Sequence, residues 1–163
     1  NGDGQFDSPC GIDIENNFIY IADRSNNRIQ IFNIVSPYAF VAKFGSLGNG
    51  DGQFNNPLGI NINLDFVYIA DDGNRRVQIF NITFPYAYVT KFGSAGSGDG
   101  QFNSPREINV DSNYIYVTDT TNNRVQIFNN FPPISGISGG GISERSAGRK
   151  LIHRDAQRRQ RNQ

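Results

Sequence analysis

One short sequence motif recurs three times at a fixed spacing. Gly-Asp-Gly-Gln-Phe occurs at residues 2–6, 50–54 and 98–102, so the period is 48 residues (50 − 2 and 98 − 50). The residues that follow each copy repeat in phase with it. A fixed period in this range is typical of supersecondary units that stack side by side, as in solenoids and propellers.

The second repeat shows the periodicity of β-strands most clearly. Apolar residues alternate with polar or small ones over residues 57–63, a short apolar run follows at 66–70, and a third strand is expected at 77–80. A fourth strand is expected over 86–92, and turns rich in Gly, Asn and Asp separate the four segments. This pattern predicts one antiparallel meander of four short strands. A helical solenoid is excluded, because no segment has a 3.6-residue apolar period.

A single small meander cannot bury both of its faces, whereas sheets stacked around an axis bury each other. We therefore predict an all-β fold, a partial propeller with three blades of four-stranded antiparallel meanders. The third blade is expected to be incomplete, because Lys-Phe-Gly-Ser at 43–46 and 91–94 has no counterpart after Asn129. The predicted organisation is a first repeat at 1–48, a second at 49–96, an incomplete third at 97–133, and a tail at 134–163.

The motifs resemble those of the NHL repeat over residues 2–129. They are Gly-Asp-Gly-Gln-Phe-x-x-Pro-x-Gly-Ile, Tyr-Ile-Ala-Asp, Asn-Asn-Arg-x-Gln-Ile-Phe and Lys-Phe-Gly-Ser. The resemblance implies propeller blades, commonly six in a closed ring. Members of the family include the C-terminal domains of tripartite-motif ubiquitin ligases, which bind RNA or proteins, and the lyase domain of peptidyl-α-hydroxyglycine processing.

Three blades cannot close such a ring, so we expect either a homodimer or further repeats to complete it. The sequence contains no Met, and we expect the chain to be a fragment of a longer polypeptide. An open arc is also expected to expose the apolar faces of its first and last sheets. The side chains expected there are Ile19, Ile21, Ile29, Ile31, Val125 and Ile127.

An Asp and an Arg five residues apart flank the turn between the second and third strands of every repeat. Such a pair can interact across the hairpin, and the Asp can also cap amides of the turn. A role that is repeated in every blade is expected to be structural. The pairs are Asp23 and Arg28, Asp71 and Arg76, and Asp119 and Arg124.

Polar residues in the loops near these pairs differ between repeats while their frame stays constant. In a meander, the loop before the first strand and the turn between the second and third strands lie on the same face. Variable polar loops on a fixed scaffold are typical of binding surfaces, although neutral drift on a solvated face gives the same pattern. Arg106 and Glu107 break the repeat most sharply, either as a ligand contact or as a local ion pair. The candidate binding residues are Arg24, Asn26, Asp72, Arg75, Arg106, Glu107, Thr120 and Thr121.

The residues required for catalysis or metal binding are sparse. His153 is the only histidine and lies in the tail, and Cys10 is the only cysteine, which we expect to be half-buried and inert. Each Gly-Asp-Gly-Gln-Phe loop offers one carboxylate, whereas Ca²⁺ takes 6–8 oxygen ligands. We therefore predict no catalytic residues, no metal and no cofactor. The alternative is a metal-dependent lyase or lactonase, by analogy with the lyase of this family and with lactonases built on propellers.

The charge is divided unevenly along the chain. Residues 1–134 carry 8 basic and 13 acidic residues, and residues 135–163 carry 7 basic and 2 acidic ones. We expect the Gly/Ser-rich and then Arg-rich tail to be disordered. A protein or peptide is the expected partner of the loop face, in a binding or scaffold role. The alternative is RNA, bound by the basic tail or by Arg24, Arg75 and Arg106. No run of about 20 apolar residues suggests a membrane partner.

Overall fold

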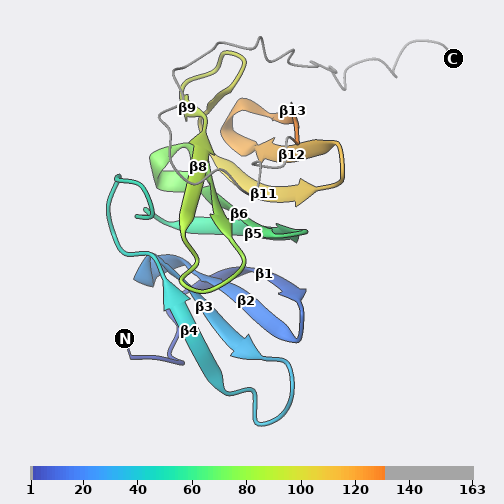
Figure 1. The fold of residues 1–163 in the computed structure, drawn as a ribbon. Helices are drawn as coiled ribbons and strands as arrows, with labels where there is room; N and C mark the ends of the chain where they lie inside the picture. The colour runs from blue at the N-terminus through green and yellow to red at the C-terminus, as the bar shows by residue number, and fades with distance from the viewer. Residues whose placement is uncertain (1, 131–163) are drawn as a thin grey trace, which may run out of the picture.

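A computed structural model describes residues 2–130, in which three antiparallel sheets stand side by side (Figure 1). We call these sheets blades 1, 2 and 3. Blade 1 contains β1 (Pro9–Glu15), β2 (Phe18–Asp23), β3 (Arg28–Asn33) and β4 (Phe40–Phe44). Blade 2 contains β5 (Pro57–Asn63), β6 (Phe66–Asp71), β7 (Arg76–Asn81) and β8 (Tyr88–Phe92). Blade 3 contains β11 (Pro105–Val110), β12 (Tyr114–Asp119) and β13 (Arg124–Asn129).

The predicted all-β partial propeller is confirmed. Within each blade, strands that are consecutive in the sequence pair antiparallel, and the blades differ only in that blade 3 has three described strands. A short parallel pair, β9 (Ser94–Ala95) with β10 (Gln101–Phe102), lies between β8 and β11 in chain order. The predicted tail, 134–163, lies outside the described residues.

The fourth strand of blade 2 begins two residues later than predicted. We expected it to start at Tyr86, but Tyr86 has a φ of 56°, and β8 begins at Tyr88. A left-handed residue with a side chain cannot continue a strand, because extended backbone needs a negative φ. Tyr86 is not part of the strand but packs against Phe44 of blade 1. The two rings are stacked, with their centroids 5.3 Å apart.

The apolar core lies between neighbouring blades. Tyr20, Ala22, Ile29 and Ile31 of blade 1 are buried in one cluster with residues of blade 2, namely Phe54, Ile60, Val67, Ile69, Phe80 and Ile82. A second cluster joins blades 2 and 3 through Phe66, Tyr68, Val77, Ile79, Phe102, Ile108, Val110, Ile115, Val117 and Phe128. Because each blade buries its neighbour's face, the stack supplies the core that one meander lacks.

The expectation that Ile29 and Ile31 lie on the open face of blade 1 is wrong. Both side chains are fully buried against blade 2. The register explains why: Ile31 pairs with Tyr20 and Ile29 with Ala22, and directly opposed residues share one face of a sheet. Ile19 and Ile21 alternate with these residues and therefore lie on the other, open face.

The first strands of the blades are neighbours in space. β5 contacts both β1 and β11, so these three strands form the inner side of the arc. The short 3₁₀ turns that follow β2, β6 and β12 repeat in each blade and connect it to its third strand. None of the helical turns within residues 2–130 is long and apolar enough to cross a membrane.

Candidate functional site

One end of every blade carries a 3₁₀ turn between its second and third strands. These turns are η1 (Arg24–Asn26), η2 (Asp72–Asn74) and η3 (Thr120–Asn122). Each ends in a left-handed residue whose N–H donates back to the first carbonyl of the turn, and these residues are Asn27, Arg75 and Asn123. The loop before the first strand lies beside the turn, as the bond from the Gly73 N–H to the Asn55 carbonyl shows (2.8 Å). We call the surface formed by these loops and turns the loop face.

A buried polar network supports the loop face of blade 2. The Asp71 carboxylate is fully buried and accepts hydrogen bonds from Asn55 N–H (2.8 Å) and Asn74 Nδ2 (2.9 Å). It also accepts from Arg76 Nε (2.8 Å) and Gln78 Nε2 (3.1 Å). The arrangement ties two strands, one turn and one loop to a single carboxylate, so it fixes the shape of the face.

The Arg76 guanidinium continues this network into the Gly-Asp-Gly-Gln-Phe loop. Its Nη1 donates to the carbonyl of Asn49, and its Nη2 donates to those of Gly50 and Gln53, each at 2.8 Å. The planar fork of an arginine matches such convergent acceptors, whereas a lysine offers only a point charge. The arginine therefore holds the Gly-Asp-Gly-Gln-Phe loop through the loop's backbone carbonyls. The glycines of the motif allow the backbone to turn.

The same pairs recur in blades 1 and 3. Arg28 Nε lies 2.8 Å from Asp23 Oδ2, and Arg124 Nε lies 3.0 Å from Asp119 Oδ2. The carboxylates do not cap the turn that follows them, which is a difference from the expected capping. They accept instead from the N–H of a residue in the preceding loop, 16 residues upstream, because that loop folds back over the strand end.

Sequence reasoning missed a third member of the network. Gln30, Gln78 and Gln126 lie in the middle of the third strands and are buried. Gln78 Nε2 donates to Asp71 and to the Gln53 carbonyl (2.6 Å), and its Oε1 accepts from Gly52 N–H (3.0 Å). The signal was present in the sequence, as a polar residue two positions after each paired arginine inside an otherwise apolar strand.

Because of this network, the free energy of unfolding is expected to fall at acidic pH. Burial raises the pKa of Asp23 and Asp119, but hydrogen bonds from the backbone, Asn26 or Asn122 and the paired arginine outweigh it. Both pKa values therefore lie below the ordinary 3.8. Groups with a lowered pKa stabilise the fold above the unfolded pKa, and this stability is lost as the pH falls through the folded pKa.

We expect the urea midpoint of unfolding to stay nearly constant from pH 7 to about 5 and to fall below about pH 4. Urea titrations followed by circular dichroism at pH 7, 5, 4 and 3 measure this directly. A midpoint unchanged down to pH 3 would show that the buried carboxylates do not hold the loops as described.

The structure divides the predicted binding residues into two groups. Asn26 and Asp72 are partly buried and serve the scaffold: Asn26 Nδ2 donates to both oxygens of Asp23, and Asp72 Oδ1 accepts from Ser104 Oγ of the next blade (2.8 Å). The remaining residues are exposed. They are Arg24, Arg75, Arg106, Glu107, Thr120 and Thr121.

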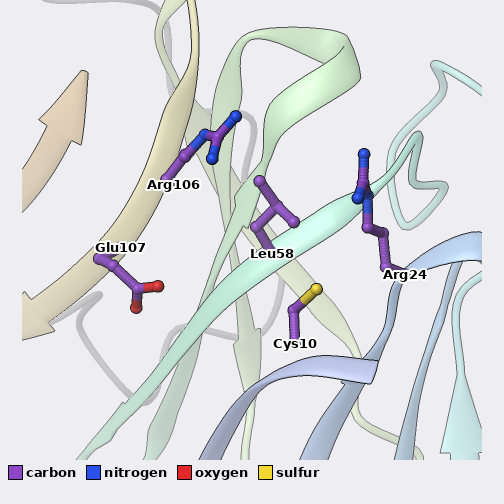
Figure 2. Close-up of a pocket in the computed structure, with 5 residues that line it drawn as sticks. All are labelled: Cys10, Arg24, Leu58, Arg106 and Glu107. Atoms are coloured by element: carbon purple, nitrogen blue, oxygen red, sulfur yellow. The ribbon is translucent and has the colours of Figure 1, made fainter. Parts of the chain in front are cut away.

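Two of these exposed arginines lie at one pocket of about 200 Å³. The pocket is lined by Cys10, Arg24, Leu58, Arg106 and Glu107, which come from all three blades (Figure 2). Figure 2 shows Arg24 and Arg106 on either side of Leu58, with Glu107 directed away from Arg106. Arg106 Nε lies 3.4 Å from Ser104 Oγ, and within residues 2–130 the guanidinium of Arg24 makes no hydrogen bond or ion pair.

Cys10 does not behave as predicted. Its side chain is exposed rather than half-buried, and its Sγ lies 3.4 Å from the Ser8 carbonyl. The corresponding Leu58 of blade 2 is partly covered, whereas Cys10 lies on the first strand of blade 1, which no described blade precedes. In the described part of the chain, no group of three His, Cys, Asp or Glu side chains is placed to hold a metal ion.

Comparison with protein families agrees with this architecture. The model of the NHL repeat matches residues 6–32 and 102–128. In the structure each match runs from the Phe of the repeated motif through the third strand, in blades 1 and 3. The matches support NHL repeats in these two segments. No curated protein matches the sequence.

Solved structures that match this chain include two bacterial proteins. A candidate phosphatase from Bacteroides thetaiotaomicron VPI-5482 has a TM-score of 0.55 and 18% identity, over 71% of this chain and 33% of its own. A candidate exported protein from Bacteroides fragilis NCTC 9343 has a TM-score of 0.45 and 14% identity, over 80% and 50% respectively. This chain therefore spans a third and a half of their lengths, and the likeness to the first concerns the fold alone.

Proposed function

We propose that this chain is a non-catalytic binding module that presents the loop face of an NHL-type propeller to a protein or peptide. In this proposal the middle segment, residues 49–96, is a third repeat of the same kind. One observation carries it: an Asp–Arg pair and a buried Gln hold the loop of every blade, while the exposed residues on the loops differ from blade to blade. A scaffold with fixed support and variable exposed loops is suited to recognition.

The pocket suggests which chemical group the partner supplies. Arg24 and Arg106 line the same pocket, and the Arg24 guanidinium has no partner among the described residues. Arginine forms its strongest contacts with carboxylates and phosphates, through two parallel N–H donors. Leu58, which lies between them in Figure 2, adds an apolar side chain to the pocket lining. We therefore favour a peptide that places an Asp or Glu side chain, or its terminal carboxylate, between the two arginines.

A random dodecamer peptide library panned on the protein tests this function. We expect the selected peptides to share an acidic residue, and the double substitution Arg24→Ala with Arg106→Ala to weaken a selected peptide about tenfold or more, since charge-assisted hydrogen bonds are lost. Arg75→Ala is the matched control, because Arg75 is also exposed but does not line the pocket. Equal affinity of all three proteins for the peptide would overturn the proposed site.

RNA is the alternative ligand, and the same two arginines would contact its phosphates. The convergence of Arg24 and Arg106 favours an anionic group of either kind. Titration with poly(U) at 50 and 200 mM salt distinguishes the two ligands. RNA binding that falls steeply with salt and depends on these arginines, without peptide binding, would favour an RNA-binding module of the tripartite-motif ligase type. If the ligand is a peptide, poly(U) should bind weakly. Arg75→Ala should then reduce poly(U) binding at least as much as the double substitution does.

A further inference from the structure

The inner strands of neighbouring blades touch through glycine. A Cβ atom placed on Gly11 of β1 would lie 2.3 Å from the Leu58 carbonyl oxygen of β5 and 2.9 Å from the Ile60 nitrogen. A Cβ on Gly59 of β5 would lie 2.3 Å from the Arg106 carbonyl oxygen of β11. Both obstacles are backbone atoms that cannot turn aside. Glycine at this position therefore permits the spacing at which a following blade stacks.

Blade 3 has no glycine at the same position. Glu107 occupies it, so a Cβ and a carboxylate stand where blades 1 and 2 have none. A second change lies beside it: Thr118 replaces the buried Ala22 and Ala70, and its Oγ1 accepts a hydrogen bond from the Glu107 N–H (2.9 Å). Both changes fall on the face of blade 3 that no described blade covers. Glu107 and Thr118 therefore distinguish this face from the equivalent faces of blades 1 and 2.

The opposite end of the arc is different. On the open face of blade 1, Ile12 is 61% exposed, whereas its counterparts Ile60 and Ile108 are 6% and 5% exposed. The preceding blade covers each of these counterparts. The open face of blade 1 therefore has the same kind of interface residue, but no described blade covers it. Contiguous apolar surface of this kind marks an interaction site. The open face of blade 1 thus resembles the faces that form the interfaces between blades 1 and 2 and between blades 2 and 3.

We propose that the open face of blade 1 binds a propeller sheet that carries glycine at the position of Gly11 and Gly59, and that Glu107 prevents blade 3 of a second copy from serving as that sheet. The Cβ of Glu107 would meet the carbonyl of Cys10, as a Cβ on Gly11 would meet that of Leu58. Two copies of this chain therefore do not close a six-bladed ring. This inference does not depend on the function proposed for the loop face.

Substitution of one residue tests the proposal. Sedimentation velocity over 1–100 µM should show a discrete species of twice the chain mass for Glu107→Gly, with dimerisation tighter by about tenfold or more than in the unaltered protein. Glu107→Ala removes the charge but keeps the Cβ. It should therefore not gain the dimer, which separates a steric block from an electrostatic one.

Two further substitutions identify the faces that the dimer uses. In the Glu107→Gly background, Ile12→Asp on blade 1 and Val125→Asp on blade 3 should each abolish the dimer. Both residues are more than half exposed in the single chain, so neither change disturbs the core. The proposal is overturned if the unaltered protein forms a dimer that both substitutions abolish, or if Glu107→Gly associates no more tightly than Glu107→Ala.

Discussion

Replacement of Asp71 by alanine is expected to lower the free energy of unfolding by about 3–5 kcal/mol. The substitution leaves the buried Arg76 guanidinium without its counter-charge and removes an acceptor for Asn55, Asn74 and Gln78. Breaking a buried pair on one side is costly because the remaining charge stays desolvated. The loss of a turn cap and one cross-strand partner alone would cost only about 1–2 kcal/mol. The full burial of Asp71 accounts for the larger value.

Urea unfolding at pH 7 measures this loss, and Asp65→Ala is the matched control. Asp65 is an exposed turn residue of the same blade, so its replacement should change stability by less than about 0.5 kcal/mol. Peptide binding by the folded fraction of Asp71→Ala should persist, because Asp71 touches no exposed loop side chain of the pocket. Unchanged stability together with a loss of binding would contradict the structural role assigned to Asp71.

The second large effect is expected from Gly59→Ala. Its Cβ would lie 2.3 Å from the Arg106 carbonyl and 2.9 Å from the Glu107 Cα, so blades 2 and 3 must move apart along their inner strands. Overpacking of this kind costs about 1–3 kcal/mol, and the backbone contact places this case at the upper end.

Thermal melts of Gly59→Ala beside Glu107→Ala compare the same position in two blades. In blade 3 no described sheet faces residue 107, so Glu107→Ala should change stability by less than about 0.5 kcal/mol. If Gly59→Ala melted like the unaltered protein, the close approach of the inner strands would not be needed for stacking. The steric basis of the proposal about Glu107 would then be lost as well.

The repeat made the strands predictable, because alternation and turn residues are local signals that recur three times. The pairing of Asp71 with Arg76 was also accessible, since residues that flank a tight hairpin turn lie opposite each other. The side of the sheet on which Ile29 and Ile31 lie was not accessible from periodicity alone. A period of two separates the faces but does not say which face meets the next blade.

The pocket was beyond sequence reasoning for a related reason. Cys10, Leu58 and Arg106 share one repeat position, but only the curvature of the stack determines that they line the same space as Arg24. Asn26 and Asp72 were predicted as binding residues because they are polar and lie in loops. Their hydrogen bonds to Asp23 and Ser104 show that polar loop residues also build the scaffold.

Chemical-shift mapping by NMR tests the central claim that the loop face is the binding surface. Titration of a selected acidic peptide into ¹⁵N-labelled protein should shift the amides of Arg24, Arg106 and Glu107. The turns at the other end of the strands, at residues 16–17, 64–65 and 112–113, should not move. Saturable binding that shifts those distal turns and leaves the amides around Arg24 and Arg106 unchanged would contradict the account.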